Sequence, residues 1–259
     1  MTKILLSGDS HCDINHLKAI SARMEKFECD KAFVLGDFGW WPKDKQGKKF
    51  IEACSKLDFP IYFLPGNHED WEDLEKHEKY PDYDDDGFIV VAPNVFYAPT
   101  GFRWEWDGVK FLSVGGAYSI DRKYRVKFIS WFPQEIITQE DMKKIQVTDI
   151  SLKREMDVIL SHDAPAGVDM AMEFACRFGD MKAFDLDSGT ETNMQRLRWA
   201  CDWWKPSHLY HGHWHLRYTQ EHEFYDSFSR ESYDIMVTGL NCNQTGGEAF
   251  HVLDTKDIK

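Results

Sequence analysis

The chain has 259 residues, of which 42% are hydrophobic and 29% are charged. This is the composition of an ordinary globular protein, and it excludes a disordered or collagen-like chain. The formal net charge is −13, from 31 Lys plus Arg against 44 Asp plus Glu, and no stretch forms a Lys/Arg-rich run. We therefore expect no broad nucleic-acid surface and no attraction to anionic membranes.

The apolar stretches and the cysteines indicate the cellular compartment of the protein. The first apolar run is interrupted at Asp9, which is too early for a signal-peptide core, and no later stretch approaches about 20 apolar residues. The six cysteines are scattered without a C-x-x-C pair, which suits reduced thiols better than disulfides or a thiolate zinc site. We expect a cytoplasmic protein with no membrane partner, and its oligomeric state stays open.

The N-terminal part alternates between short apolar runs and helical periodicity. The pattern predicts strands at Lys3–Ser7, Ala32–Leu35 and Ile61–Leu64, with helices over 14–27 and Lys48–Leu57 between them. Turn residues and polar side chains directly follow each predicted strand. This order is typical of a sheet built from βα units.

The four closely spaced apolar runs after Gly87 predict an antiparallel region, as do the runs of the tail from Phe224 onward, and Asp107-Gly108 predicts a tight hairpin turn. The predicted strands here are Phe88–Val91, Val95–Tyr97, Phe102–Trp106 and Val109–Val114, followed by a helix at Thr138–Ile145, a strand at Val158–Ser161, a helix at Thr190–Trp204, and strands at Ser207–Tyr210, Phe224–Ser227, Asp234–Val237 and Ala249–Leu253. The acidic stretch Asp82–Asp86 is interpreted as a solvated turn, because it lacks the spacing of a calcium loop. Without a repeat or a linker, the chain is expected to be a single domain over residues 1–259.

Side chains of the metal-ligand and acid–base types follow several predicted strands. In open α/β sheets, ligands bind outside the carboxyl ends of the strands. Any one of these residues alone would be interpreted as structural, but their common placement predicts a site. Carboxylate, amide and imidazole groups without thiolates suit Mn, Fe, Zn or Ni better than calcium. The residues are Asp9, His11, Asp37, Asn67, His68, His162, His213 and His215.

These residues stand in five ordered blocks that resemble the motifs of the calcineurin-like metallophosphoesterase superfamily. The blocks are Gly8-Asp9-Ser10-His11, Gly36-Asp37, Gly66-Asn67-His68-Glu69, His162 and Gly212-His213-Trp214-His215. The resemblance spans residues 9 to 215. It implies an α/β fold, a four-layer α/β/β/α sandwich of two mixed β-sheets flanked by helices, with a dinuclear metal site at the carboxyl ends of the strands.

The resemblance also implies roles for individual residues. Asp9, His11 and His215 would hold one metal ion, and Asn67, His162 and His213 would hold the other. Asp37 would bridge the two ions. His68 would be the catalytic group, acting as an acid or stabilising negative charge. Two divalent ions are implied, with Mn favoured and Fe, Zn, Ni or Mg as alternatives.

General chemistry provides a reason for such an arrangement. Two ions about 3.5–4 Å apart can clamp the attacking and leaving oxygens of a phosphoryl transfer and lower the pKa of a bound water to about 7. A histidine beside them can protonate the leaving oxygen or donate to a phosphate oxygen. Asp37, Glu69 and Asp70 are equal candidates for orienting its imidazole. The glycines before the ligands suggest tight turns.

Three further residues are candidates for contacting the substrate. Trp40, next to Trp41, could stack a nucleobase or could pack in the sandwich. Gly115-Gly116-Ala117-Tyr118-Ser119-Ile120-Asp121-Arg122 resembles the Gly-Gly-Ala segment of the family, so Tyr118 is a pocket candidate and Arg122 could bind phosphate or form an ordinary salt bridge. Together with Trp131-Phe132-Pro133, this segment is similar to small bacterial and bacteriophage-encoded members.

The sequence therefore predicts an enzyme, a dinuclear metal-dependent hydrolase of a phosphodiester or nucleotide. A phosphomonoesterase, either a protein phosphatase or a nucleotidase, is an alternative that the motifs leave open, because one fold supports several activities. A metal-binding scaffold without turnover is a third hypothesis. It is disfavoured because all the ligand positions and His68 are intact. The expected partner is a small phosphoester or nucleotide.

Overall fold

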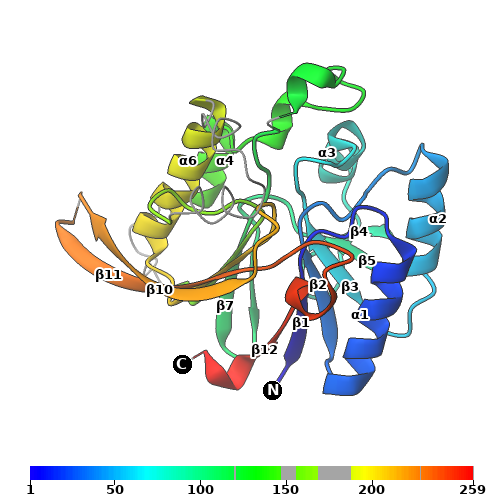
Figure 1. Ribbon diagram of the computed structural model, residues 1–259, viewed down its shortest axis with the longest axis horizontal. Helices are drawn as coiled ribbons and strands as arrows, with labels where there is room; N and C mark the ends of the chain where they lie inside the picture. The colour runs from blue at the N-terminus through cyan, green and yellow to red at the C-terminus, as the bar shows by residue number, and fades with distance from the viewer. Residues whose placement is uncertain (120, 147–155, 169–187, 228, 259) are drawn as a thin grey trace.

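The computed structural model describes residues 1–119, 121–146, 156–168, 188–227 and 229–258, and its backbone forms two six-stranded mixed sheets (Figure 1). The first sheet has the strand order β12-β1-β2-β3-β5-β4. The pairs β1/β2, β2/β3 and β3/β5 are parallel, whereas β12 and β4 are antiparallel to their neighbours. Its strands are β1 (Lys3–Ser7), β2 (Lys31–Leu35), β3 (Ile61–Leu64), β4 (Ile89–Ala92), β5 (Val95–Tyr97) and β12 (Phe250–Asp254).

The second sheet has the order β10-β11-β9-β8-β7-β6. Its four central strands are parallel, and antiparallel hairpins add β6 at one edge and β10 at the other. The predicted Asp107-Gly108 turn joins β6 to β7. The strands are β6 (Arg103–Trp106), β7 (Val109–Val114), β8 (Val158–Ser161), β9 (His208–His211), β10 (Tyr218–Asp226) and β11 (Glu231–Gly239).

The alternation of side chains along the strands creates three apolar layers. In β1, Ile4 and Leu6 point into a core shared by both sheets, while Leu5 points to the opposite face. That opposite face is covered by α1 (Ile14–Phe27), α2 (Lys45–Cys54) and α3 (Trp71–Lys79). The outer face of the second sheet is covered by α4 (Gln139–Ile145) and α6 (Ser188–Trp204). The predicted four-layer α/β/β/α sandwich is thereby confirmed. Side chains alternate between the two faces of each strand, so strands that lie between a helical layer and the other sheet bury both faces.

Element boundaries differ from the prediction where capping groups decide them. Helix α2 begins at Lys45 rather than Lys48, because the Asp44 carboxylate accepts hydrogen bonds from two backbone N–H groups of the first turn. Helix α3 was not predicted. Only Trp71 and Leu74 are buried along it, and two apolar positions are too few to create a helical hydrophobic periodicity. Among the described residues, no helix is both long enough and apolar enough to cross a membrane.

The parallel strands of both sheets direct their carboxyl ends to the same side of the sandwich, the upper side in Figure 1. Strands β1, β2 and β3 of the first sheet and β8 and β9 of the second end there. The five motif blocks follow these five strands directly. The topology thus gathers blocks that are far apart in the chain, from residue 9 to residue 215.

The glycines of the motifs leave room for side chains from other motifs. A Cβ atom on Gly66 would lie 2.1 Å from Asp37 Oδ1, and one on Gly212 would lie 2.3 Å from Asp9 Oδ1. Neither glycine has a positive φ, so the need at these two positions is space rather than a left-handed turn. Our expectation of tight turning is corrected for both. Each glycine allows its loop to lie directly against a buried carboxylate.

We predict that Gly66→Ala displaces the Asp37 carboxylate, because a methyl group there cannot avoid Asp37, which is itself buried. Bound metal per chain, measured by inductively coupled plasma mass spectrometry after loading with Mn²⁺, should fall well below that of the parent protein. Gly247→Ala is the matched control, since a Cβ at Gly247 meets no atom within 4 Å. Equal metal content in both variants would contradict the interpretation.

Candidate metal centre

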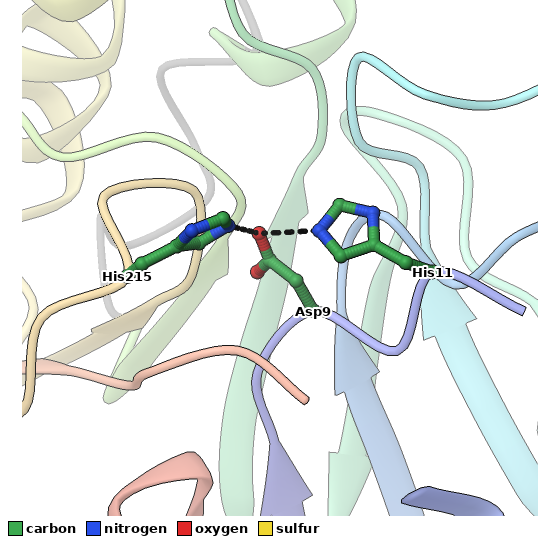
Figure 2. Close-up of side chains that lie close together, drawn as sticks. All are labelled: Asp9, His11 and His215. Carbon is green, nitrogen blue, oxygen red and sulfur yellow. Dashed lines mark hydrogen bonds and ion pairs between the residues drawn. The ribbon is translucent and has the colours of Figure 1, made fainter. Parts of the chain in front are cut away.

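Two groups of candidate ligands adjoin each other at the strand ends, and Asp9 belongs to both. Asp9, His11 and His215 form one group, and Asp9, Asp37 and His162 form the other. Within each group, the ligand atoms lie within 4.8 Å of one another. Figure 2 shows the first group, with Asp9 Oδ2 between the two imidazoles, 2.9 Å from His215 Nε2 and 3.8 Å from His11 Nε2.

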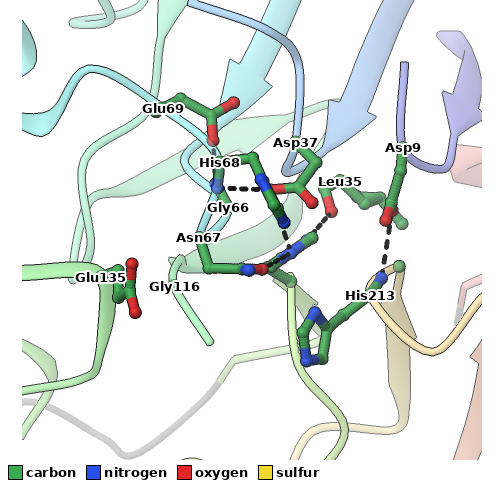
Figure 3. A network of polar contacts seen from close by, with 12 residues as sticks. Asp9, Leu35, Asp37, Gly66, Asn67, His68, Glu69, Gly116, Glu135 and His213 are labelled. Carbon is green, nitrogen blue, oxygen red and sulfur yellow. Dashed lines mark hydrogen bonds and ion pairs between the residues drawn. The ribbon is translucent and has the colours of Figure 1, made fainter. Parts of the chain in front are cut away.

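The second group is centred on Asp37. Asp37 Oδ1 lies 3.4 Å from His162 Nε2, and Asp37 Oδ2 lies 3.8 Å from His11 Nδ1. Asp37 therefore lies between His11 of the first group and His162 of the second. Asn67 completes this arrangement, because its Oδ1 atom lies 3.0 Å from His162 Nε2 (Figure 3).

The chemistry of these atoms fits a cation. His162 Nδ1 lies 2.8 Å from the carbonyl oxygen of Leu35, which can only accept, so Nδ1 must carry the hydrogen. In a neutral imidazole, Nε2 then presents a lone pair toward Asn67 Oδ1 and Asp37 Oδ1, which are also acceptors. A divalent ion among these three atoms would satisfy all of them.

Backbone conformation places several of these side chains. His11, Asp37, His213 and His215 all have positive φ values, between 45° and 61°. Left-handed backbone at residues other than glycine costs on the order of 1–3 kcal/mol each and collects at functional sites. Four such residues after the ends of three strands indicate a geometry that the surrounding structure imposes.

Burial and the neighbouring imidazoles have opposite effects on the pKa values of Asp9 and Asp37. Asp9 is fully buried and Asp37 is 2% exposed. Burial alone would raise both pKa values, but the hydrogen bond from His215 and the nearby His162 lower the pKa of Asp9 below its usual range. His162 and His68 likewise lower the pKa of Asp37. Both carboxylates are therefore held ionised in a buried environment, which is favourable only beside positive charge.

His213 is placed differently from the other candidates. Its backbone N–H donates to Asp9 Oδ1 over 3.0 Å, but its ring points away from Asp9 (Figure 3). The ring lies 4.9 Å from that of His162, measured between centroids, and it enters neither ligand group. Burial lowers the pKa of His213 to about 3, so its imidazole is neutral. A rotation of this side chain would be needed to bring it to the ligands.

His68 lies at the edge of the two groups. Its ring is 5.7 Å from that of His11, and its backbone N–H donates to Asp37 Oδ1 over 2.8 Å. Of the three carboxylates considered for orienting its ring, Asp37 lies beside His68, whereas Glu69 and Asp70 have other partners. Glu69 accepts hydrogen bonds from the backbone N–H groups of Gly39 and Gly66, and Asp70 caps α3.

The two tryptophans after Asp37 occupy different environments. Trp40 is 2% exposed, packs on Phe63 and donates from Nε1 to Asp73. Trp40 therefore packs in the core of the sandwich, which was one of the two interpretations of this residue, and is not exposed for stacking on a nucleobase. Trp41 is half-buried and donates from Nε1 to the carbonyl oxygen of His68 over 2.7 Å. Trp41 is therefore the aromatic residue of this pair that lies against the site.

Tyr118 and Arg122 contact each other. The Arg122 guanidinium lies 4.4 Å above the Tyr118 ring and 4.1 Å from the Trp131 ring. Its Nη2 atom lies 3.5 Å from a carboxylate oxygen of Glu135, which is fully buried. The ion pair considered for Arg122 in the sequence is therefore present, and it holds together the segment after β7.

Sequence reasoning missed two residues of the same segment. Ser119 Oγ accepts a hydrogen bond from Asn67 Nδ2 over 2.9 Å and another from Arg125 Nη1 over 2.7 Å. The first bond fixes the amide of Asn67 so that Oδ1 faces His162. Arg125 thus places a positive charge next to Ser119 and Asn67. Burial is the largest cause of the lowered pKa of His68, and the charge of Arg125 lowers this pKa further. A basic residue three positions after Arg122 was the only sequence signal.

Comparisons with known proteins agree with this fold. A family model described as calcineurin-like phosphoesterase matches residues 2–217. One crystal structure is similar with a TM-score of 0.57 and 14% identity, covering 100% of this chain and 96% of that one. The protein TT1561 of Thermus thermophilus is similar with a TM-score of 0.50 and 13% identity, covering 90% of this chain and 97% of that one. These two similarities concern the fold alone.

A structure of a novel archaeal phosphodiesterase has a TM-score of 0.41 and 15% identity, covering 99% of this chain and 96% of that one. Comparison with curated protein sequences finds no match. The family model covers more than four fifths of the chain and includes all five motif blocks. The chain belongs to the calcineurin-like phosphoesterase family.

Proposed function

We propose that the protein is a dinuclear metal-dependent phosphoesterase that hydrolyses a phosphodiester or a nucleotide, with His68 as its catalytic group. Family membership supports metal-dependent phosphoester hydrolysis. The observation that supports the metal centre most strongly is the meeting of His162 Nε2, Asn67 Oδ1 and Asp37 Oδ1, three atoms able to bind a cation, at the strand ends.

The residues divide into two sets in this proposal. Asp9, His11 and His215 hold one divalent ion. Asn67 and His162 hold the other, with His213 joining them after its ring rotates. Asp37 bridges the sets, consistent with its place between His11 and His162. Bound divalent ions lower the pKa of a water ligand to about 7 and neutralise charge on phosphoryl oxygens.

The chain itself supplies orientation and a proton donor. Leu35 holds the His162 tautomer, and Ser119 holds the Asn67 amide, so both ligands are aligned before anything binds. His68 lies beside the ligands, where its ring can donate to a phosphate oxygen or to the leaving oxygen. Trp41 Nε1 donates a hydrogen bond to the backbone carbonyl of His68 and so helps to fix the backbone of this residue. We propose Mn²⁺ as the preferred ion, following the family resemblance; the oxygen and imidazole donors suit Fe, Zn and Ni as well.

Two chromogenic substrates test the proposal. Protein stripped with a chelator should hydrolyse neither bis-p-nitrophenyl phosphate nor p-nitrophenyl phosphate, and reloading with Mn²⁺ should restore turnover of the diester in preference to the monoester. A preference for the monoester would replace the diesterase proposal with a phosphomonoesterase. Absence of turnover with protein that binds two Mn²⁺ per chain would favour a scaffold.

The role of His68 is tested separately. His68→Ala should lower turnover of the diester by about 10²- to 10⁴-fold, the usual contribution of a positioned acid or base. Its metal content should stay near that of the parent, because His68 is not among the proposed ligands. Asp37→Ala provides the contrast, since loss of the bridge should remove metal as well as activity. Parent-like turnover by His68→Ala would refute its role.

The support of Asn67 by Ser119 leads to a further prediction. Ser119→Ala removes the acceptor that holds the Asn67 amide, so Mn²⁺ affinity should fall about tenfold or more, as measured by isothermal titration calorimetry. Ser21→Ala is the matched control, because its hydroxyl donates only to a carbonyl within α1. Equal affinities in the two variants would show that Ser119 does not orient the ligand.

A further inference from the structure

The segment of residues 121–131 projects from the sandwich on the side where the strands end (Figure 1). We refer to this segment as the arm. It follows β7 in the chain and includes the short helix η1 (Arg122–Tyr124). Arg125 anchors its base to the candidate site through Ser119, whose hydroxyl also accepts from Asn67. The arm is therefore joined directly to the proposed active centre.

The tip of the arm exposes large apolar side chains. Tyr124 is 81% exposed, Val126 57%, Phe128 53% and Ile129 67%. The backbone nevertheless has a defined turn, because the carbonyl of Val126 accepts from Ile129 and Ser130, and Phe128 N–H donates to the carbonyl of Trp131. Exposed apolar groups on an internally hydrogen-bonded turn indicate a binding surface rather than a loosely packed loop.

Cations are interleaved with these apolar residues. Lys123 Nζ lies 5.0 Å from the Tyr124 ring centroid, and Lys127 Nζ lies 4.9 Å from that of Phe128. The arm contains four basic residues and one acidic residue, whereas the whole chain carries a net charge of −13. The arm thus presents a positive, aromatic surface beside the proposed phosphoester site. It is too small to act as a broad basic groove.

We propose that the arm binds single-stranded nucleic acid, so that the substrate of the proposed phosphodiesterase is a short oligonucleotide whose flanking nucleotides lie on the arm. The inference rests on the proposed function for the location of the cleaved bond. Single-stranded nucleic acids bind where aromatic rings stack bases and nearby cations contact the backbone. Tyr124 with Lys123 and Phe128 with Lys127 each provide one such pair.

The occupant is chosen by charge and by position. The chain carries a net charge of −13, which disfavours long-range attraction of a polyanion and so favours a narrow, flexible strand on the short arm over a duplex or a flat anionic membrane. The direct connection from Arg125 to Ser119 and Asn67 places the bound strand next to the ligands. An oligonucleotide provides both the phosphodiester for the centre and the bases for the arm.

Direct binding tests the arm independently of turnover. Fluorescence anisotropy of a labelled oligothymidylate of about ten nucleotides, within the usual range of such sites, is measured with metal-stripped protein. Tyr124→Ser combined with Phe128→Ser should raise Kd about tenfold or more, as expected for the loss of base stacking. Tyr80→Ser is the matched control with unchanged Kd, because Tyr80 is 75% exposed and also has a lysine over its ring.

The salt dependence provides a second measurement that a merely structural role would not change. Lys123→Gln combined with Lys127→Gln should reduce the slope of log Kd against log salt concentration by about 1.4, the loss of two phosphate contacts on a single strand. Circular dichroism spectra should match those of the parent, since all four substituted side chains are exposed. An unchanged slope would overturn the assignment of these lysines.

The failure of this inference and that of the proposed function give different results. If bis-p-nitrophenyl phosphate is hydrolysed but the arm variants bind the oligonucleotide like the parent, the arm inference is wrong and the phosphodiesterase stands. If the oligonucleotide binds through the arm but no diester is hydrolysed, the proposed function alone fails. Binding of the arm to anionic vesicles, or dimer formation through it, without oligonucleotide binding would also overturn the inference.

Discussion

The buried carboxylates Asp9 and Asp37 are the constraint on which the rest of this structure depends. Each is almost completely removed from water, and an ionised group in such a place is stable only beside compensating charge. Histidines from three separate strand ends surround the two carboxylates, and the backbone N–H groups of His68 and His213 donate to them. The grouped ligand atoms could also hold cations there. The site is consequently a property of both sheets together.

Close approach of the loops is what makes this possible. Gly66 lies against Asp37 and Gly212 against Asp9, each so near that a single methyl group would collide with the carboxylate. Glu69 links the loops of the first sheet by accepting from Gly39 and Gly66. The motif glycines and the motif ligands are therefore complementary parts of one packing arrangement, in which the glycine of one block makes room for the ligand of another.

Charge is distributed to match this centre. The surface as a whole is acidic, so a phosphorylated ligand gains little from long-range attraction and depends on local groups. Positive side chains beside the site come from the arm, where Arg125 reaches inward to Ser119 and the lysines face outward next to aromatic rings. In our proposals the centre performs the chemistry and the arm selects the substrate.

The four-layer class was implied by the resemblance of the five motif blocks to a known family. Sequence patterns alone predicted most of the strands and helices, although not α3, and the set of residues at the strand ends. These signals are local, because an apolar run followed by a polar turn marks a strand end without knowledge of its neighbours. Tertiary structure alone decided that Trp41 rather than Trp40 lies at the site, that Arg122 pairs with Glu135 while Arg125 reaches Asn67 through Ser119, and that Gly66 and Gly212 provide space. The physical reason is that side-chain direction and close contact depend on residues distant in the chain, which only the packing of both sheets brings together.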